Sequence, residues 1–177
     1  MSRHPVCWRA LARESLLMPP ERPIGNRLDY STRRLRRGRI SSPGEIYLLT
    51  AVTRCRAPVF ADFTAARWMI QAFSSCRHDA KTLCFVVMPD HFHWLVQLGD
   101  QLTLHQLAAK AKAQASRRLG RHRNEQIDSL WQDGFHDFRL RPDDDPRACA
   151  RYVIRNPIRA GLVNSVRDYP HWDALWI

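Results

Sequence analysis

The sequence predicts a mixed α+β domain built on an antiparallel sheet, and three observations lead to this fold class. Strand-length runs of aliphatic and β-branched residues alternate with segments of helical apolar spacing, in the order strand-helix-strand-strand-helix-strand-helix. Two of the runs are separated by a Pro-Asp turn, which is typical of a hairpin. A chain of 177 residues with 45% hydrophobic residues is long enough to bury one core.

The first predicted strand spans residues 45–53, which are rich in aliphatic and β-branched residues. Asp62 is an N-cap candidate for a helix that runs to about residue 78. Residues 80–88 place apolar side chains on both faces of an extended strand, so a central strand buried on both faces is expected there. The apolar residues of the predicted helix, at helical spacing, are Phe63, Ala66, Met69, Ile70 and Phe73.

The next predicted strand, residues 91–98, carries two histidines on one face. Successive side chains of a strand point to opposite faces, so His91 and His93 share a face with Leu95, while Phe92 and Trp94 lie on the other. Neutral imidazole is the commonest nitrogen ligand of metals in proteins, which makes the histidines a candidate metal-binding pair. The Asp90 side chain has two possible roles: a hydrogen bond to the backbone of its own turn, or a hydrogen bond to the ring of His91 that orients this ligand.

A second helix is predicted to begin near Thr103, whose hydroxyl and the Gln106 side chain fit a capping box. One face of this helix is apolar and the other is basic, with no acidic residue anywhere in 101–124. A solvated face normally mixes both signs of charge, so we favour phosphate contact over simple solvation. The basic residues assigned to this contact are Lys110, Lys112, Arg117, Arg118 and Arg121.

The last third of the chain is predicted to hold a turn at Asp133-Gly134, a short strand and a final helix. The aromatic residues of 131–141 have two possible roles, core packing or stacking on bases. Asp145 as N-cap and Pro146 at the first helical position start the helix, and Pro157 ends it. Tyr152 and Asn156 are four residues apart, hence on one face, although each alone would also suit a core tyrosine or a C-terminal cap.

Residues 1–40 form a basic arm that differs in composition from the folded domain expected over 41–177. The arm holds ten arginines against three acidic residues, a net +7 of the total +11. Its prolines break regular structure, and residues 33–39 have neither helical nor strand period. For residues 1–17 we favour a solvated tail, and for 33–39 contact with phosphates. The arginines concerned are Arg33, Arg34, Arg36, Arg37 and Arg39.

The net charge of +11 and a pI of about 10.3 point to a polyanionic partner, and nucleic acid is favoured over a membrane surface. No run approaches the ~18 apolar residues that span a bilayer, and no signal sequence is evident, so we expect a cytoplasmic, nucleoid-associated protein without a membrane partner. The five cysteines are scattered and odd in number, which indicates neither a disulfide framework nor a zinc ribbon.

The segments Met88-Pro-Asp-His-Phe-His-Trp-Leu and Tyr152-Val-Ile-Arg-Asn-Pro-Ile-Arg-Ala-Gly-Leu-Val resemble motifs of the REP-associated tyrosine transposases, which belong to the single-tyrosine HUH (His-hydrophobe-His) endonucleases. The resemblance covers roughly residues 38–170. It implies a ferredoxin-like antiparallel sheet with helices on one face. Residue by residue, it implies that His91 and His93 bind the metal, that Tyr152 is the nucleophile, and that Asn156 is the third, amide ligand. It also requires the helix bearing Tyr152 to pack over the face of the histidines.

The function implied is cleavage and strand transfer of single-stranded DNA carrying palindromic hairpins, through a 5′-phosphotyrosine intermediate. We expect Mg²⁺ or Mn²⁺ as cofactor; the nitrogen ligands permit zinc, but an amide oxygen is an unusual ligand for it. The protein would act as a monomer or homodimer. An alternative is a catalytically inactive, domesticated protein that only binds DNA hairpins. A replication initiator or relaxase is less consistent with the Asn-Pro-x-Arg-Ala-Gly run.

Overall fold

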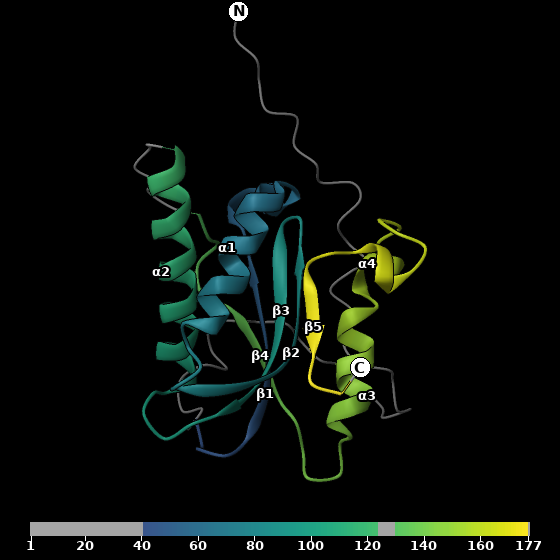
Figure 1. Ribbon diagram of the computed structural model, residues 1–177. Helices are drawn as coiled ribbons and strands as arrows, with labels where there is room; N and C mark the ends of the chain where they lie inside the picture. Colours follow the sequence, from purple (N-terminus) through teal and green to yellow (C-terminus); the bar gives the residue numbers. More distant parts are fainter. Residues whose placement is uncertain (1–40, 124–129, 177) are drawn as a thin grey trace, which may run out of the picture.

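A computed structural model describes residues 41–123 and 130–176 (Figure 1). The basic arm over residues 1–40, with its five candidate DNA-binding arginines, lies outside the described residues. The boundary expected near residue 40 therefore stays a prediction.

The described residues form one five-stranded antiparallel sheet with strand order β4-β1-β3-β2-β5. The mixed α+β class, the antiparallel sheet and the predicted order of elements are confirmed. An additional strand, β5, pairs with the edge of β2 and was not predicted, because three residues are too few to show a period. The strands are β1 (Ile46–Val52), β2 (Ala80–Met88), β3 (His91–Leu98), β4 (His136–Arg139) and β5 (Trp172–Ala174).

The helices begin where their capping residues predict. The Asp62 side chain accepts from the Ala65 backbone N–H at 2.7 Å, and that of Asp145 accepts from Arg147 at 2.9 Å. The capping box also forms, with the Thr103 N–H donating to Gln106 at 2.9 Å. The α-helices are α1 (Phe63–Ser74), α2 (Leu104–Arg123), α3 (Pro146–Ile154) and α4 (Asn156–Arg159), and the short 3-10 helices are η2 (Arg54–Arg56), η3 (Val59–Ala61) and η4 (Val166–Asp168).

Helices cover both faces of the sheet, so the expectation of helices on one face is wrong. One apolar cluster joins Phe92 and Trp94 of β3 to α1 and α2. A second joins Leu95 of β3 to Val153 and Ile154 of α3 on the opposite face. The reason is that β2 and β3 are buried on both sides, so each face needs an apolar partner. Figure 1 shows α3 on the other side of the sheet from α1 and α2.

The aromatic residues of the 131–141 segment belong to the core. The Trp131 ring lies 5.5 Å from that of Phe60 and 5.6 Å from that of Phe92, and its Nε1 donates to the Lys112 carbonyl. Phe135 packs against the first cluster and Phe138 against the second. Core packing is therefore the role that the structure assigns to them, rather than base stacking.

The cysteines Cys76, Cys84 and Cys149 are buried, and burial raises the pKa of each thiol, that of Cys149 to about 12. They are inert packing residues. Across the part of the chain that the structure describes, no helix is both long and apolar enough to cross a bilayer.

Candidate functional site

The two histidines form a buried pair at the start of β3. His91 is 2% exposed and His93 is 7% exposed. Their ring centroids lie 4.9 Å apart with the planes nearly perpendicular, at 87°. Alternation along β3 places both on the face of Leu95, and α3 packs on this face of the sheet. Within the described residues neither Nε2 atom has a hydrogen-bond partner, although both are buried.

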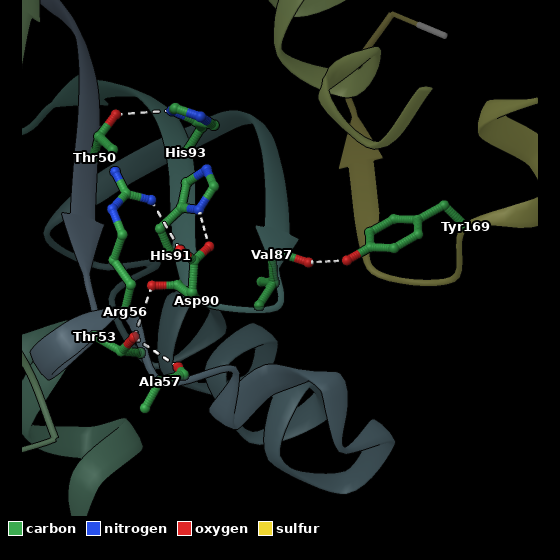
Figure 2. A network of polar contacts seen from close by, with 9 residues as sticks. All are labelled: Thr50, Thr53, Arg56, Ala57, Val87, Asp90, His91, His93 and Tyr169. Carbon is green, nitrogen blue, oxygen red and sulfur yellow. Dashed lines mark hydrogen bonds and ion pairs between the residues drawn. The ribbon is translucent and has the colours of Figure 1, made fainter. Parts of the chain in front are cut away.

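The orientation of His91 is set by a carboxylate. Its Nδ1 donates to Oδ1 of Asp90 at 2.5 Å, and Oδ2 of Asp90 accepts from Nη1 of Arg56 at 2.8 Å (Figure 2). Burial raises the pKa of the Asp90 carboxyl, but the hydrogen bonds and charges of His91 and Arg56 together bring this pKa below its usual value. Because the carboxylate stays charged, it favours a proton on Nδ1, and in the neutral tautomer with that proton the lone pair lies on Nε2.

The orientation of His93 is set from the neighbouring strand. Its Nδ1 forms a 2.7 Å hydrogen bond with Oγ1 of Thr50, which is its cross-strand partner in β1 (Figure 2). Burial, then the charges of His91 and Arg159, lower the pKa of His93 well below its usual value, so the ring is neutral. A neutral ring carries one N–H, and at Nε2 that proton would be buried without an acceptor. We therefore assign Nδ1 as the donor to Thr50 and Nε2 as the lone pair.

The Arg56 side chain reaches Asp90 from a strained segment. Cys55 and Arg56 have φ angles of 54° and 52°, in the left-handed region that non-glycine residues rarely adopt. The Thr53 hydroxyl bonds the backbone carbonyls of Ala57 at 2.7 Å and of Asp90 at 2.9 Å, which ties this segment to the β2–β3 turn. The strain is thus held in place at the residues that support His91. No sequence pattern indicated this contact.

Tyr152 and Asn156 are joined by Arg159. Asn156 is 1% exposed, and its Nδ2 donates to the Val153 carbonyl at 2.7 Å, so it also caps the end of α3. Nη2 of Arg159 donates to Oδ1 of Asn156 at 2.7 Å, and the guanidinium carbon lies 3.8 Å from the centroid of the Tyr152 ring. The predicted proximity of Tyr152 and Asn156 holds, although Arg155 separates α3 from α4. An amide oxygen has two lone pairs, and the bond from Arg159 uses one of those on Oδ1.

Arg159 is a site residue that sequence reasoning missed. It lies inside the Asn-Pro-Ile-Arg motif, so the signal was present, but no role was assigned to it. Its charge also acts on His93 and lowers the pKa of that ring. One guanidinium therefore contacts the tyrosine and the asparagine and lies within electrostatic reach of His93.

A second tyrosine, Tyr169, lies close to this site, but it is committed to a structural bond. Its hydroxyl donates to the Val87 carbonyl at 2.7 Å (Figure 2). Burial, with the charge of Asp90, raises the pKa of Tyr169 to about 12. A phenol that is both bonded and harder to ionise is a poor nucleophile, so Tyr152 is the better candidate.

The structure does not bring the basic residues of α2 together with the histidine pair, because α2 packs on the opposite face of the sheet. Lys110 forms an ion pair with Asp79 at 2.6 Å, and Nζ of Lys112 donates to the carbonyls of Gln132 and Gly134. Arg118 donates to the Gln71 side chain. The side chains of Arg117 and Arg121 are exposed. Phosphate contact by α2 stays a prediction, and these two arginines suit it better than the engaged lysines.

The donor set fits a divalent metal ion. Among residues 41–123 and 130–176, no group of three or more His, Cys, Asp or Glu residues could hold a metal. The fit rests instead on the two buried, unpartnered Nε2 atoms of His91 and His93. Neutral imidazole nitrogens are common ligands of divalent metal ions in proteins.

Comparison with known proteins places these residues in a family. The family model described as "Transposase IS200 like" matches residues 44–156. A curated protein of Haemophilus influenzae, named as a REP-associated tyrosine transposase, is 26% identical over 138 residues, which cover 72% of this chain and 78% of that protein.

Among solved structures, one described as a REP-associated tyrosine transposase bound to a REP hairpin superposes with a TM-score of 0.62 at 22% identity. The match covers 76% of this chain and 79% of that one, and it supports the fold. The family match spans more than half of the chain and includes the histidine pair, Tyr152 and Asn156. The chain therefore belongs to the IS200-like transposase family.

Proposed function

We propose that this protein is a metal-dependent single-stranded DNA endonuclease and strand transferase that acts on palindromic hairpin DNA through Tyr152. Membership of a transposase family supports a DNA-processing enzyme. The observation that carries the finer proposal is the pair of buried, unpartnered Nε2 atoms on the sheet face that α3 covers, since α3 also carries Tyr152.

His91, His93 and Asn156 would hold Mg²⁺ or Mn²⁺, which when bound supplies a Lewis acid for a non-bridging oxygen of the scissile phosphate. The protein's own contribution is to prepare the ligands. Asp90 and Thr50 hold the Nδ1 protons, so each Nε2 presents its lone pair without rearrangement.

Tyr152 would attack the scissile phosphorus in line. The bond from the phenol oxygen to phosphorus forms as the bond from phosphorus to the 3′ oxygen breaks, which leaves a 5′-phosphotyrosine and a free 3′-OH. The phenol proton passes to solvent and the leaving 3′ oxygen takes up a proton. Because the phosphodiester energy is retained in the covalent link, rejoining to another 3′-OH requires no ATP.

A hairpin substrate is supported by the net charge of +11 and by the structural relative that is bound to a REP hairpin. The arginines of residues 33–39 are assigned to phosphates of the stem or its flank, and Arg117 and Arg121 to further backbone contacts. The assembly would be a monomer or a homodimer, and the protein would act at the nucleoid.

The test is incubation with a single-stranded hairpin DNA and Mn²⁺, followed by denaturing electrophoresis. Wild-type protein should give a covalent adduct that is lost in Tyr152→Phe. Tyr169→Phe is the matched control, because it removes a nearby phenol that bonds a backbone carbonyl, and it should keep the adduct. Binding without any adduct in Mg²⁺ or Mn²⁺ would overturn the proposal and indicate an inactive hairpin-binding protein.

A further inference from the structure

One large aromatic side chain, Phe63, projects from the surface at the start of α1. It is 59% exposed, whereas most other aromatic residues of the described chain are buried or half-buried. A single exposed apolar side chain is common on protein surfaces, so exposure alone assigns Phe63 no role, but the free face of the ring is accessible to a ligand. Its place in the fold therefore indicates what it contacts.

The inner side of Phe63 rests on a fixed aromatic pair. Its ring centroid lies 5.2 Å from that of His171, which in turn lies 5.6 Å from Tyr169. His171 is 6% exposed, and its carbonyl accepts from the Val87 N–H at 2.8 Å. The Tyr169 hydroxyl bonds the Val87 carbonyl. The ring of Phe63 is thus backed by groups tied to β2, while its outer side faces solvent.

A cation lies beside this ring. Arg67 follows Phe63 by four residues, hence on the same side of α1, and it is exposed. Burial lowers the pKa of His171, and the charge of Arg67 lowers this pKa further, which is consistent with a guanidinium near the aromatic cluster. Within the residues that the structure describes, no carboxylate forms an ion pair with Arg67, and the nearby Asp62 carboxylate is engaged by the Ala65 N–H.

The cluster lies at the same end of the sheet as the histidine pair. The Phe60 N–H donates to the Pro89 carbonyl at 2.8 Å. Phe60 is three residues before Phe63, and Pro89 is two residues before His91, so this bond joins the two segments. The charge of Asp90 contributes to the raised pKa of Tyr169, which indicates that Tyr169 lies within electrostatic reach of the β2–β3 turn. Figure 1 shows the β2–β3 turn and α4 at this end of the molecule.

We propose that Phe63, backed by His171 and flanked by Arg67, is a stacking site for an unpaired base of the single-stranded DNA next to the hairpin. Every base has a π-face that stacks on an aromatic ring, and a guanidinium beside it suits the backbone phosphate of the same nucleotide. The site lies in the unpaired flank because a base inside a duplex stem is already stacked on its neighbours. The inference rests on the proposed function only for the identity of the ligand, a DNA hairpin with a single-stranded flank. It does not require cleavage by Tyr152.

The test measures binding in the Tyr152→Phe background without divalent metal, so cleavage plays no part. Two DNA probes are compared: a hairpin with a single-stranded flank that carries 2-aminopurine at successive positions, and the same hairpin without a flank. We expect one flank position to change fluorescence on binding. Phe63→Ala should abolish this signal and weaken binding of the flanked hairpin about 5- to 150-fold, with the flankless hairpin unchanged. Phe63→Trp should keep the signal.

Leu175→Ala is the matched control, since Leu175 is another large apolar residue with a similar exposed fraction, 56%, on a different surface. It should change neither probe, and melting curves should show that Phe63→Ala is folded, because the ring is mostly exposed. Equal effects of Phe63→Ala on both probes, or none on either, would overturn the inference. A change of molecular mass in light scattering with unchanged fluorescence would show a contact between copies instead. If wild-type protein gives no covalent adduct, the proposed function fails. The fluorescence and binding measurements in the Tyr152→Phe background still test the stacking site, because they do not depend on cleavage.

Discussion

Replacing Thr50 by valine removes one hydroxyl behind the histidine pair and preserves the shape of the side chain. Valine suits a β-strand, so β1 should form normally. The change deletes the 2.7 Å hydrogen bond to Nδ1 of His93 and leaves that nitrogen buried without its partner. The neutral ring can then place its proton on Nε2, the atom that would bind the metal.

Two effects of different size are expected. An unsatisfied buried polar atom lowers the free energy of unfolding by about 1–3 kcal/mol. Loss of the group that orients a metal-binding imidazole weakens metal affinity about 10- to 100-fold, equivalent to about 1.4–2.7 kcal/mol. The first effect is common to any lost buried hydrogen bond, whereas the second is specific to a ligand.

Mn²⁺ affinity is measured from the electron paramagnetic resonance signal of the free ion, and stability from thermal unfolding. Thr82→Val is the matched control, because the Thr82 hydroxyl accepts from Nε1 of Trp94 at 3.1 Å in the same sheet. This control should lose stability and keep Mn²⁺ affinity. Unchanged affinity in Thr50→Val, or an equal loss of affinity in both variants, would refute the role assigned to Thr50.

Arg159→Lys should slow cleavage at saturating hairpin about 10- to 100-fold, with hairpin affinity nearly unchanged. The reason is that lysine has no planar group that can stack on Tyr152 and bond Asn156 at once. In the same single-turnover kinetics, Arg155→Lys should match wild type, because Arg155 is exposed. Asn156→Ala should lower the free energy of unfolding in urea by about 1–3 kcal/mol, since the cap of α3 is lost, and an unchanged midpoint would contradict this role. Gly99→Ala should destabilise the fold by about 1–3 kcal/mol in the same assay, because an added Cβ would lie 2.5 Å from the Asp79 carbonyl oxygen, and a neutral effect would refute the clash.

The elements with local signals were predicted well. The strands β2 and β3 have the bounds that their apolar runs and the Pro-Asp turn indicate, and Asp62, Thr103 and Asp145 all cap the helices they precede. Caps and periodicity depend on neighbours within a few residues, so sequence alone carries them. The three-residue β5 and the placement of helices on both faces escaped prediction, since they depend on what packs against an already formed sheet.

The sequence by itself determined the chemical types at the candidate site: two imidazoles on one face of a strand, and a tyrosine and an asparagine one helical turn apart. Only the tertiary structure decided which atoms those imidazoles present. Thr50 is 43 residues from its partner His93, and Arg56 is 34 residues from Asp90. Tertiary packing also placed α2 on the face away from the histidines. Such contacts arise from the pairing of distant strands and the burial of both sheet faces, which no local pattern encodes.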